Sequence, residues 1–139
     1  MKQAQTELAI ATSGRGLTEI TGDVVAWTRR QDVVTGMLTV YCRHTSASLT
    51  IQENADPDVM RDLDTFFQRL VPEDPSLYRH TAEGPDDMPA HIRSALTDVS
   101  LNLPVGDGRP ALGTWQGIYL FEHRARPHRR RIVLHLLGD

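Results

Sequence analysis

Apolar and polar positions follow strand patterns along much of the chain. Residues 37–42 form an apolar run rich in β-branched and aromatic side chains, which is typical of a buried strand. Residues 48–52 alternate between polar and apolar, as a half-buried strand does. Further strands are predicted over residues 7–11, from Leu101 and Leu103 onward, and over residues 118–123 and 132–136, the last two joined by a basic turn.

Two longer segments have the apolar spacing of helices. The first begins at Pro57, directly after the N-cap residue Asp56, and is closed by Pro72. The second is predicted to begin near Met88, with Asp87 as its N-cap. A short third helix is expected over residues 23–27. Because strands and two or three helices occur without regular βαβ alternation, the pattern predicts an α+β fold with a mainly antiparallel sheet.

Length and composition indicate the number of domains and exclude some classes of protein. A chain of 139 residues matches one domain, which we expect to span residues 1–139. No apolar run approaches the roughly 20 residues that cross a bilayer, and the first residues do not resemble a signal peptide. The formal net charge of -3 does not favour nucleic acid as a partner. With its single cysteine, Cys42, the chain is expected to be cytoplasmic, with no membrane partner.

The first candidate segment for chemistry connects the strands at residues 37–42 and 48–52. It contains His44, Thr45 and Ser46, followed later by Glu53 and Asn54. Hydroxyl and backbone N–H groups at a strand end can hold an oxyanion, and a histidine can donate or titrate. The alternative is a turn whose hydroxyls satisfy its own backbone.

The second candidate segment, residues 80–91, holds two histidines and three carboxylates. His91 would lie about one helical turn after Asp87, a spacing at which the two side chains can share a metal ion or pass a proton. The alternative is that the acidic residues only cap the helix. Capping leaves His80 and Glu83 unexplained.

The third candidate segment comprises residues 113–117 and 122–124. Gly113 and Gly117 flank a tryptophan and an amide, which suggests close approach to the backbone. The alternative for Trp115 is a core position, which is the more frequent outcome for a tryptophan. Glu122 and His123 should face opposite sides of a strand, so only one is expected to face the site of Gln116. The arginines at 124–131 are either a solvated turn or an attraction for an anionic ligand.

Taken together, these segments resemble the YjbQ-like family, once described as an uncharacterised protein family. The resemblance covers nearly the whole chain in order. Its most specific strings are Asp86-Asp87-Met88-Pro89-Ala90-His91 and Gly113-Thr114-Trp115-Gln116-Gly117, supported by His44-Thr45-Ser46-Ala47, Glu53-Asn54-Ala55-Asp56-Pro57 and Glu122-His123-Arg124. Ser46 stands where many relatives carry threonine, and it keeps the hydroxyl.

The resemblance implies a β-sandwich or distorted barrel of mainly antiparallel strands with two or three helices, usually assembled as a homotrimer. It also implies a weak, secondary thiamine-phosphate synthase activity. That reaction joins hydroxymethylpyrimidine diphosphate to a thiazole phosphate and releases pyrophosphate. The alternatives are a module that binds a metal or a phosphorylated metabolite without dedicated catalysis, and a hydrolase of such a metabolite.

If the synthase reaction holds, the candidate residues take the following roles. The expected ligand is a small phosphorylated molecule or another anion. Oxygen ligands such as Glu53 and Glu83 suit Mg²⁺, whereas histidines suit zinc, and phosphate binding without a metal is a further alternative. The catalytic candidates are His44, Asp87, His91 and His123; the metal candidates are His44, His91, His123, Glu53 and Glu83; the substrate-binding candidates are Thr45, Ser46, Asn54, Gly113, Thr114, Trp115, Gln116 and Arg124.

Overall fold

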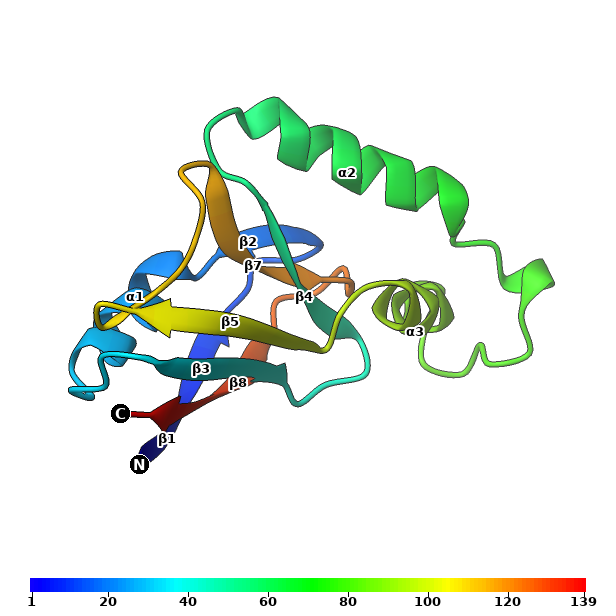
Figure 1. Ribbon diagram of the computed structural model, residues 1–139. Helices are drawn as coiled ribbons and strands as arrows, with labels where there is room; N and C mark the ends of the chain where they lie inside the picture. Colours follow the sequence, from blue (N-terminus) through cyan, green and yellow to red (C-terminus); the bar gives the residue numbers. More distant parts are fainter.

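The larger of two antiparallel sheets brings the two ends of the chain together (Figure 1). In this computed structural model, which describes residues 1–139, the sheet has the order β1-β8-β3-β5-β6. Lys2 pairs with Gly138, and β8 lies between β1 and β3 from Ile132 to Gly138. The strands are β1 (Lys2–Ala11), β3 (Gly36–Cys42), β5 (Ser100–Gly106), β6 (Arg109–Pro110) and β8 (Arg129–Gly138).

The smaller sheet carries parts of the first and third candidate segments. Its order is β2-β7-β4, with β2 at Gly16–Glu19, β7 at Gln116–Glu122 and β4 at Ala47–Glu53. The register places Ala47 opposite Glu122 and Glu53 opposite Gln116. The two curled antiparallel sheets and the helices agree with the predicted α+β fold.

Three α-helices complete the fold: α1 (Thr21–Arg29), α2 (Pro57–Leu70) and α3 (Asp87–Leu96), with a 3-10 turn, η1 (Pro75–Leu77), between the last two. Figure 1 shows α2 crossing above the sheets and α3 beside the end of β4. Asp56 caps α2 as predicted, because its carboxylate accepts the Asp58 N–H at 2.9 Å. None of the residues of α2 is buried.

The predicted role of Asp87 as a helix cap is wrong. Asp86 occupies the N-cap position of α3 and makes no capping bond, while Asp87 is the first helical residue. Its carboxylate points instead at Arg124, His80 and His91. Strong ionic partners therefore outweigh the local preference of an aspartate for the helix end.

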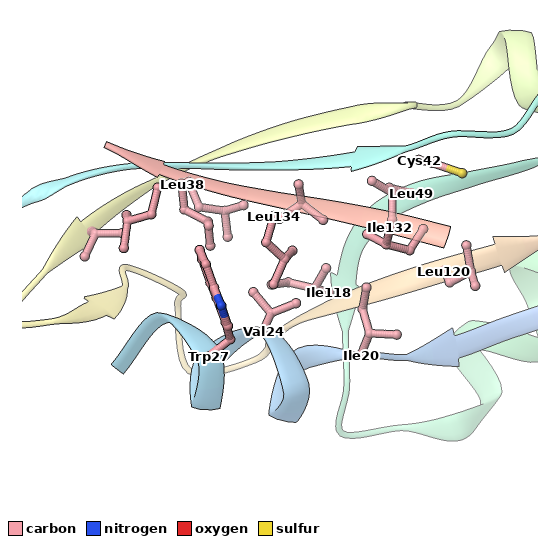
Figure 2. Packing of buried hydrophobic residues seen from close by; sticks show 14 of the residues in the cluster. Ile20, Val24, Trp27, Leu38, Cys42, Leu49, Ile118, Leu120, Ile132 and Leu134 are labelled. Atoms are coloured by element: carbon pink, nitrogen blue, oxygen red, sulfur yellow. The ribbon is translucent and has the colours of Figure 1, made fainter. Parts of the chain in front are cut away.

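The core lies between the sheets and α1 (Figure 2). Leu38 and Leu134 from the larger sheet, Ile118 from the smaller sheet and Val24 from α1 are completely buried. Trp27 of α1 packs against the same cluster. Burial of each such side chain contributes about 1.5–3 kcal/mol to folding. No helix of the structure is long and apolar enough to cross a membrane.

Candidate functional site

Two histidines converge on one carboxylate oxygen at the start of α3. Oδ2 of Asp87 lies 2.7 Å from Nε2 of His80 and 3.1 Å from Nε2 of His91. The three potential ligand atoms all lie within 4.8 Å of one another. The site is therefore a compact set of two imidazoles and one carboxylate, here called the His80–Asp87–His91 cluster.

Local structure accounts for this convergence. Asp87 and His91 are four residues apart on α3, so both side chains lie on the same face of the helix. His80 comes from the loop between η1 and α3. The Asp87 side chain is 3% exposed, whereas those of His80 and His91 are 45% and 32% exposed. The carboxylate thus forms the floor of a site whose imidazoles reach solvent.

The hydrogen bond of Nδ1 of His91 determines which protonation states are open to Nε2, the nitrogen that faces Asp87. Nδ1 of His91 lies 3.0 Å from the carbonyl oxygen of Thr45, which can only accept a hydrogen bond. Nδ1 must therefore carry a proton. Nε2 then either carries a second proton, making His91 an imidazolium beside Asp87, or presents a lone pair. A lone pair 3.1 Å from a carboxylate oxygen is favourable only with a cation between the two atoms.

Arg124, just beyond the end of β7, fixes the acidic side of the cluster. Its Nη1 lies 2.8 Å from Oδ1 of Asp87, and its Nε donates to Oδ2 of Asp86 at 2.9 Å. Burial would raise the pKa of Asp87, but the hydrogen bond to His80 and the charges of His91 and Arg124 outweigh it and lower the pKa. The hydrogen bond with Asp86 raises the pKa of Arg124. Asp87 is accordingly an anion that is held in one orientation.

A groove runs from the cluster along the connection between β3 and β4. One hollow of about 230 Å³ is lined by His44, Thr45, His91, Ser94, Ala95 and Val99. A second hollow of about 440 Å³ shares His44, Thr45 and Val99 and extends to Tyr41, Cys42 and Arg43. Polar backbone, a histidine and apolar side chains thus line a surface next to His91 that is large enough for a small metabolite.

His44 lines this groove but is already engaged. Its Nε2 accepts the Arg131 N–H at 2.8 Å, so this nitrogen is not free for a metal. Burial and the nearby charge of Arg130 lower the pKa of His44, which favours the neutral imidazole. The structure therefore places His44 near His91 as a wall of the groove and not in the cluster.

A buried ion pair supports the other end of the same connection. Arg130 donates from Nε to Oε1 of Glu122 at 2.8 Å and pairs with Oε2 through Nη2. The same Nη2 contacts the Ser46 hydroxyl oxygen at 3.1 Å and the Ser46 carbonyl oxygen at 3.2 Å. Arg130 thus holds Ser46 in place, and Ser46 is next in sequence to Thr45, whose carbonyl oxygen contacts His91.

His123 lies in the interior instead of in the cluster. It is completely buried, and its Nε2 is 2.8 Å from the Ser48 hydroxyl. Burial, with the charges of Arg93 and Arg130, lowers the pKa of His123 to about 3, so the imidazole is neutral. Glu122 is also buried and faces Arg130, so neither residue faces the site of Gln116.

The structure separates the remaining predicted residues from the cluster within one chain. Glu53 and Asn54 lie at the opposite end of the β4–β7 pair, six residues or about 20 Å from Ala47 and Glu122. The loop of residues 113–116 lies at that same far end, where Asn54 donates its N–H to the Trp115 carbonyl oxygen at 3.0 Å. Oε1 of Gln116 accepts the Gly113 N–H at 2.8 Å, and Thr114 is exposed.

The core alternative for Trp115 is wrong, because its side chain is 63% exposed. The expectation that Arg124–Arg131 form either a solvated turn or an anion attractor holds only in part: Arg126 and Arg129 are exposed, while Arg130 is buried against Glu122. Glu83 lies at the edge of the cluster, 3.8 Å from Nε2 of His80 and largely exposed.

Comparison with known proteins identifies the family. The family model described as "UPF0047 protein YjbQ-like" matches residues 6–139. A UPF0047 protein of Synechocystis is 55% identical over 138 residues, 99% of this chain and 94% of its own length. The UPF0047 protein YjbQ of Escherichia coli O157:H7 is 43% identical over 97% of this chain and 98% of its own. The chain belongs to the YjbQ-like family.

Solved structures of the YjbQ-like fold agree with this assignment. A crystal structure of a YjbQ/UPF0047 family protein from Clostridium acetobutylicum superimposes with a TM-score of 0.87 at 34% identity, covering 95% of this chain and 99% of that chain. A hypothetical protein from Aeropyrum pernix superimposes with a TM-score of 0.89 at 29% identity, over 98% and 99% of the two chains. The family to which this chain belongs is one of unknown function.

In this YjbQ-like chain, the sequence pattern does not single out two residues that build the candidate site. The first is His80, which capping leaves unexplained and which is not among the metal ligands predicted from the sequence. A loop, not a helical turn, brings His80 to Asp87, seven residues further along the chain. Arg130 looked like one of several arginines in a turn, and only the buried partner Glu122 distinguishes it.

Proposed function

We propose that this protein is a metal-dependent enzyme acting on a small phosphorylated molecule, with a divalent cation held by His80, Asp87 and His91. One observation carries the proposal: His91 is committed through Nδ1 to a carbonyl while its Nε2 faces the carboxylate of Asp87. Metal-bound histidines commonly donate their other ring N–H to a carbonyl in this way.

The donor set favours zinc or another transition metal over magnesium. Two imidazole nitrogens and one carboxylate match the three protein ligands of catalytic zinc sites, which leave a position open for water or substrate. Magnesium prefers an all-oxygen shell. Of the metal candidates chosen from the sequence, only His91 belongs to this set. His44 is occupied by the Arg131 N–H, while His123 and Glu53 lie elsewhere.

A bound cation would act as a Lewis acid on a phosphoryl oxygen. The chain's own groups have separate tasks. Arg124 orients Asp87 through Oδ1 and leaves Oδ2 to the histidines. The groove beside His44 and Thr45 holds the organic part of the ligand. Exposure of His80 and His91 lets the phosphoryl group reach the cluster.

Thiamine-phosphate synthesis, as the family resemblance implies, is the reaction to test first. Departure of pyrophosphate from hydroxymethylpyrimidine diphosphate needs charge neutralisation, which a cation held by His80, Asp87 and His91 would supply. The product bond then forms to the thiazole nitrogen. We propose this as a weak side activity. Hydrolysis of a phosphorylated metabolite is the second candidate, because a zinc ion held by His80, Asp87 and His91 would supply activation of water.

The homotrimer that the resemblance implies would complete the site. In one chain, Trp115 is exposed and lies far from the groove together with Asn54 and Gln116. In a cyclic assembly, this loop of one subunit can cover the groove of the next, where the indole would stack on a heteroaromatic ring. Light scattering of the purified protein tests the assembly, and a monomer at assay concentration would rule it out.

Metal content and turnover test the enzyme proposal. Wild-type protein should retain about one zinc per chain after dialysis, whereas Asp87→Asn and His91→Gln should lose roughly tenfold or more in zinc affinity. His135→Gln is the matched control, because His135 lies on β8 bonded to Gln5 and away from the cluster. Turnover of the two thiamine precursors should fall in parallel with metal content. Equal zinc affinity in His91→Gln and His135→Gln would contradict the proposed site.

A further inference from the structure

A second charged site lies on the other side of α3. Arg93 follows His91 by two residues, a spacing that points the two side chains to different faces of the helix. Its side chain is 1% exposed and extends toward the end of α2, where Nη2 donates to the Val71 carbonyl oxygen at 2.9 Å. Nε and Nη1 of Arg93 are buried and have no hydrogen-bond partner.

Arg93 also lacks a counterion of its own. No carboxylate oxygen lies within 4 Å of its guanidinium, although a buried charge is normally paired. The neighbouring Arg15 adds like charge. The two carboxylates nearby belong to Arg15: Glu73 lies 2.7 Å from its Nη1 and Asp64 lies 3.8 Å from its Nε. Nε of Arg15 is likewise buried without a hydrogen-bond partner.

Both guanidinium groups line one cavity. It has a volume of about 240 Å³ and is lined by Arg15, Gln68, Pro72, Glu73 and Arg93. Of these side chains only Pro72 is apolar, so the cavity is polar and favours water or an ion. His123, whose charge would add repulsion, is neutral here because burial lowers its pKa to about 3. The cavity therefore combines unsatisfied N–H donors, two guanidinium groups and space, and Glu73, its one lining carboxylate, is paired with Arg15.

We propose that this cavity, here called the Arg15–Arg93 cavity, binds a small oxyanion such as inorganic phosphate or the phosphate group of a metabolite. An oxyanion accepts several charge-assisted hydrogen bonds at once, which matches the free N–H groups of two arginines. The Gln68 amide at the rim donates one hydrogen to Oδ2 of Asp64 at 2.6 Å and can donate its second to the anion. This site is separate from the His80–Asp87–His91 cluster, and it does not depend on the function proposed for that cluster.

Phosphate titration by calorimetry, at constant ionic strength maintained with NaCl, tests the site. Wild-type protein should bind phosphate saturably. Arg93→Met should weaken the affinity roughly tenfold to hundredfold, the range expected for charge-assisted hydrogen bonds to a buried guanidinium. Gln68→Glu places a negative charge at the exposed rim and should also weaken binding. Arg61→Gln, an exposed arginine paired with Asp58 on α2, is the control and should bind as wild type does.

A second arm separates this cavity from the cluster at the start of α3. Asp87→Asn should leave phosphate affinity at the Arg15–Arg93 cavity unchanged, even where it abolishes zinc binding. Absence of saturable binding in wild-type protein would overturn the proposal. Equal affinities in Gln68→Glu and Arg61→Gln would also overturn it, and this comparison stands even where Arg93→Met does not fold, because Gln68 is exposed.

Discussion

Replacing Glu122 by glutamine should destabilise the protein strongly. The carboxylate is completely buried and accepts from the Thr12 hydroxyl at 2.6 Å, from Arg130 and from the Arg124 N–H at 3.2 Å. Glutamine keeps the shape but has one acceptor oxygen. Its NH₂ group would face donors, and Arg130, which is 4% exposed, would lose its only counterion.

The magnitude follows from the burial of both partners. Removing one partner of a buried ion pair costs about 3–5 kcal/mol, because the remaining charge stays desolvated and unpaired. That is a large part of a typical total stability of about 5–15 kcal/mol. Replacing both partners, as Glu122→Gln with Arg130→Met, should recover part of the loss, since no buried charge is then left.

Urea unfolding at one fixed protein concentration measures these free energies of unfolding, so that any assembly contributes equally to each variant. Glu7→Gln is the matched control. Glu7 also pairs with two arginines, Arg43 and Arg131, but on the surface, where ion pairs contribute little. A loss in Glu122→Gln no greater than the loss in Glu7→Gln would refute the reasoning.

Three further predictions concern single side chains. His123 has a pKa of about 3 in the folded state against 6.5 when free, so the unfolded state binds more protons below pH 6.5. The free energy of unfolding should therefore fall by up to about 1.4 kcal/mol per pH unit as the pH is lowered from 6.5 to 5. Urea unfolding at several pH values should show a weaker dependence of this free energy on pH in His123→Gln. Asp56→Ala should cost about 0.5–2 kcal/mol by removing the cap of α2, measured by urea unfolding, with an unchanged midpoint as the contrary result. Leu134→Ala should cost about 2–5 kcal/mol in the same assay, because Leu134 is completely buried in the core; a loss below 1 kcal/mol would contradict that packing.

Most strands and helices could be predicted because their signals are local. The apolar run at residues 37–42 became β3, and the capped, periodic segment after Asp56 became α2. Strand β1 was predicted from residue 7, yet it begins at Lys2. Residues 2–6 are polar except for Ala4, and they become a strand through pairing with β8, a partner more than 100 residues away along the chain. Sequence periodicity does not contain that partner.

The site was only partly predictable for a similar reason. The spacing of Asp87 and His91 was visible, since helical geometry determines it. The counterion of Asp87 was not visible, because Arg124 lies far along the chain, just beyond the end of β7, and Asp87 was therefore mistaken for a cap. Trp115 was expected in the core from the usual behaviour of tryptophan, but the loop after β6 presents it to solvent. Long-range contacts decide these positions.

The contact that most constrains the cluster is also invisible in any sequence. His91 is oriented by the carbonyl oxygen of Thr45, and every residue type supplies a carbonyl. What matters is the position of the backbone, which the Glu122–Arg130 pair fixes through the neighbouring Ser46. Substitution of the Thr45 side chain should therefore leave the Nδ1 proton of His91 in place, whereas loss of Glu122 removes the support beneath that backbone. The buried ion pair thus supports the backbone next to the Thr45 carbonyl, and that carbonyl contacts Nδ1 of His91.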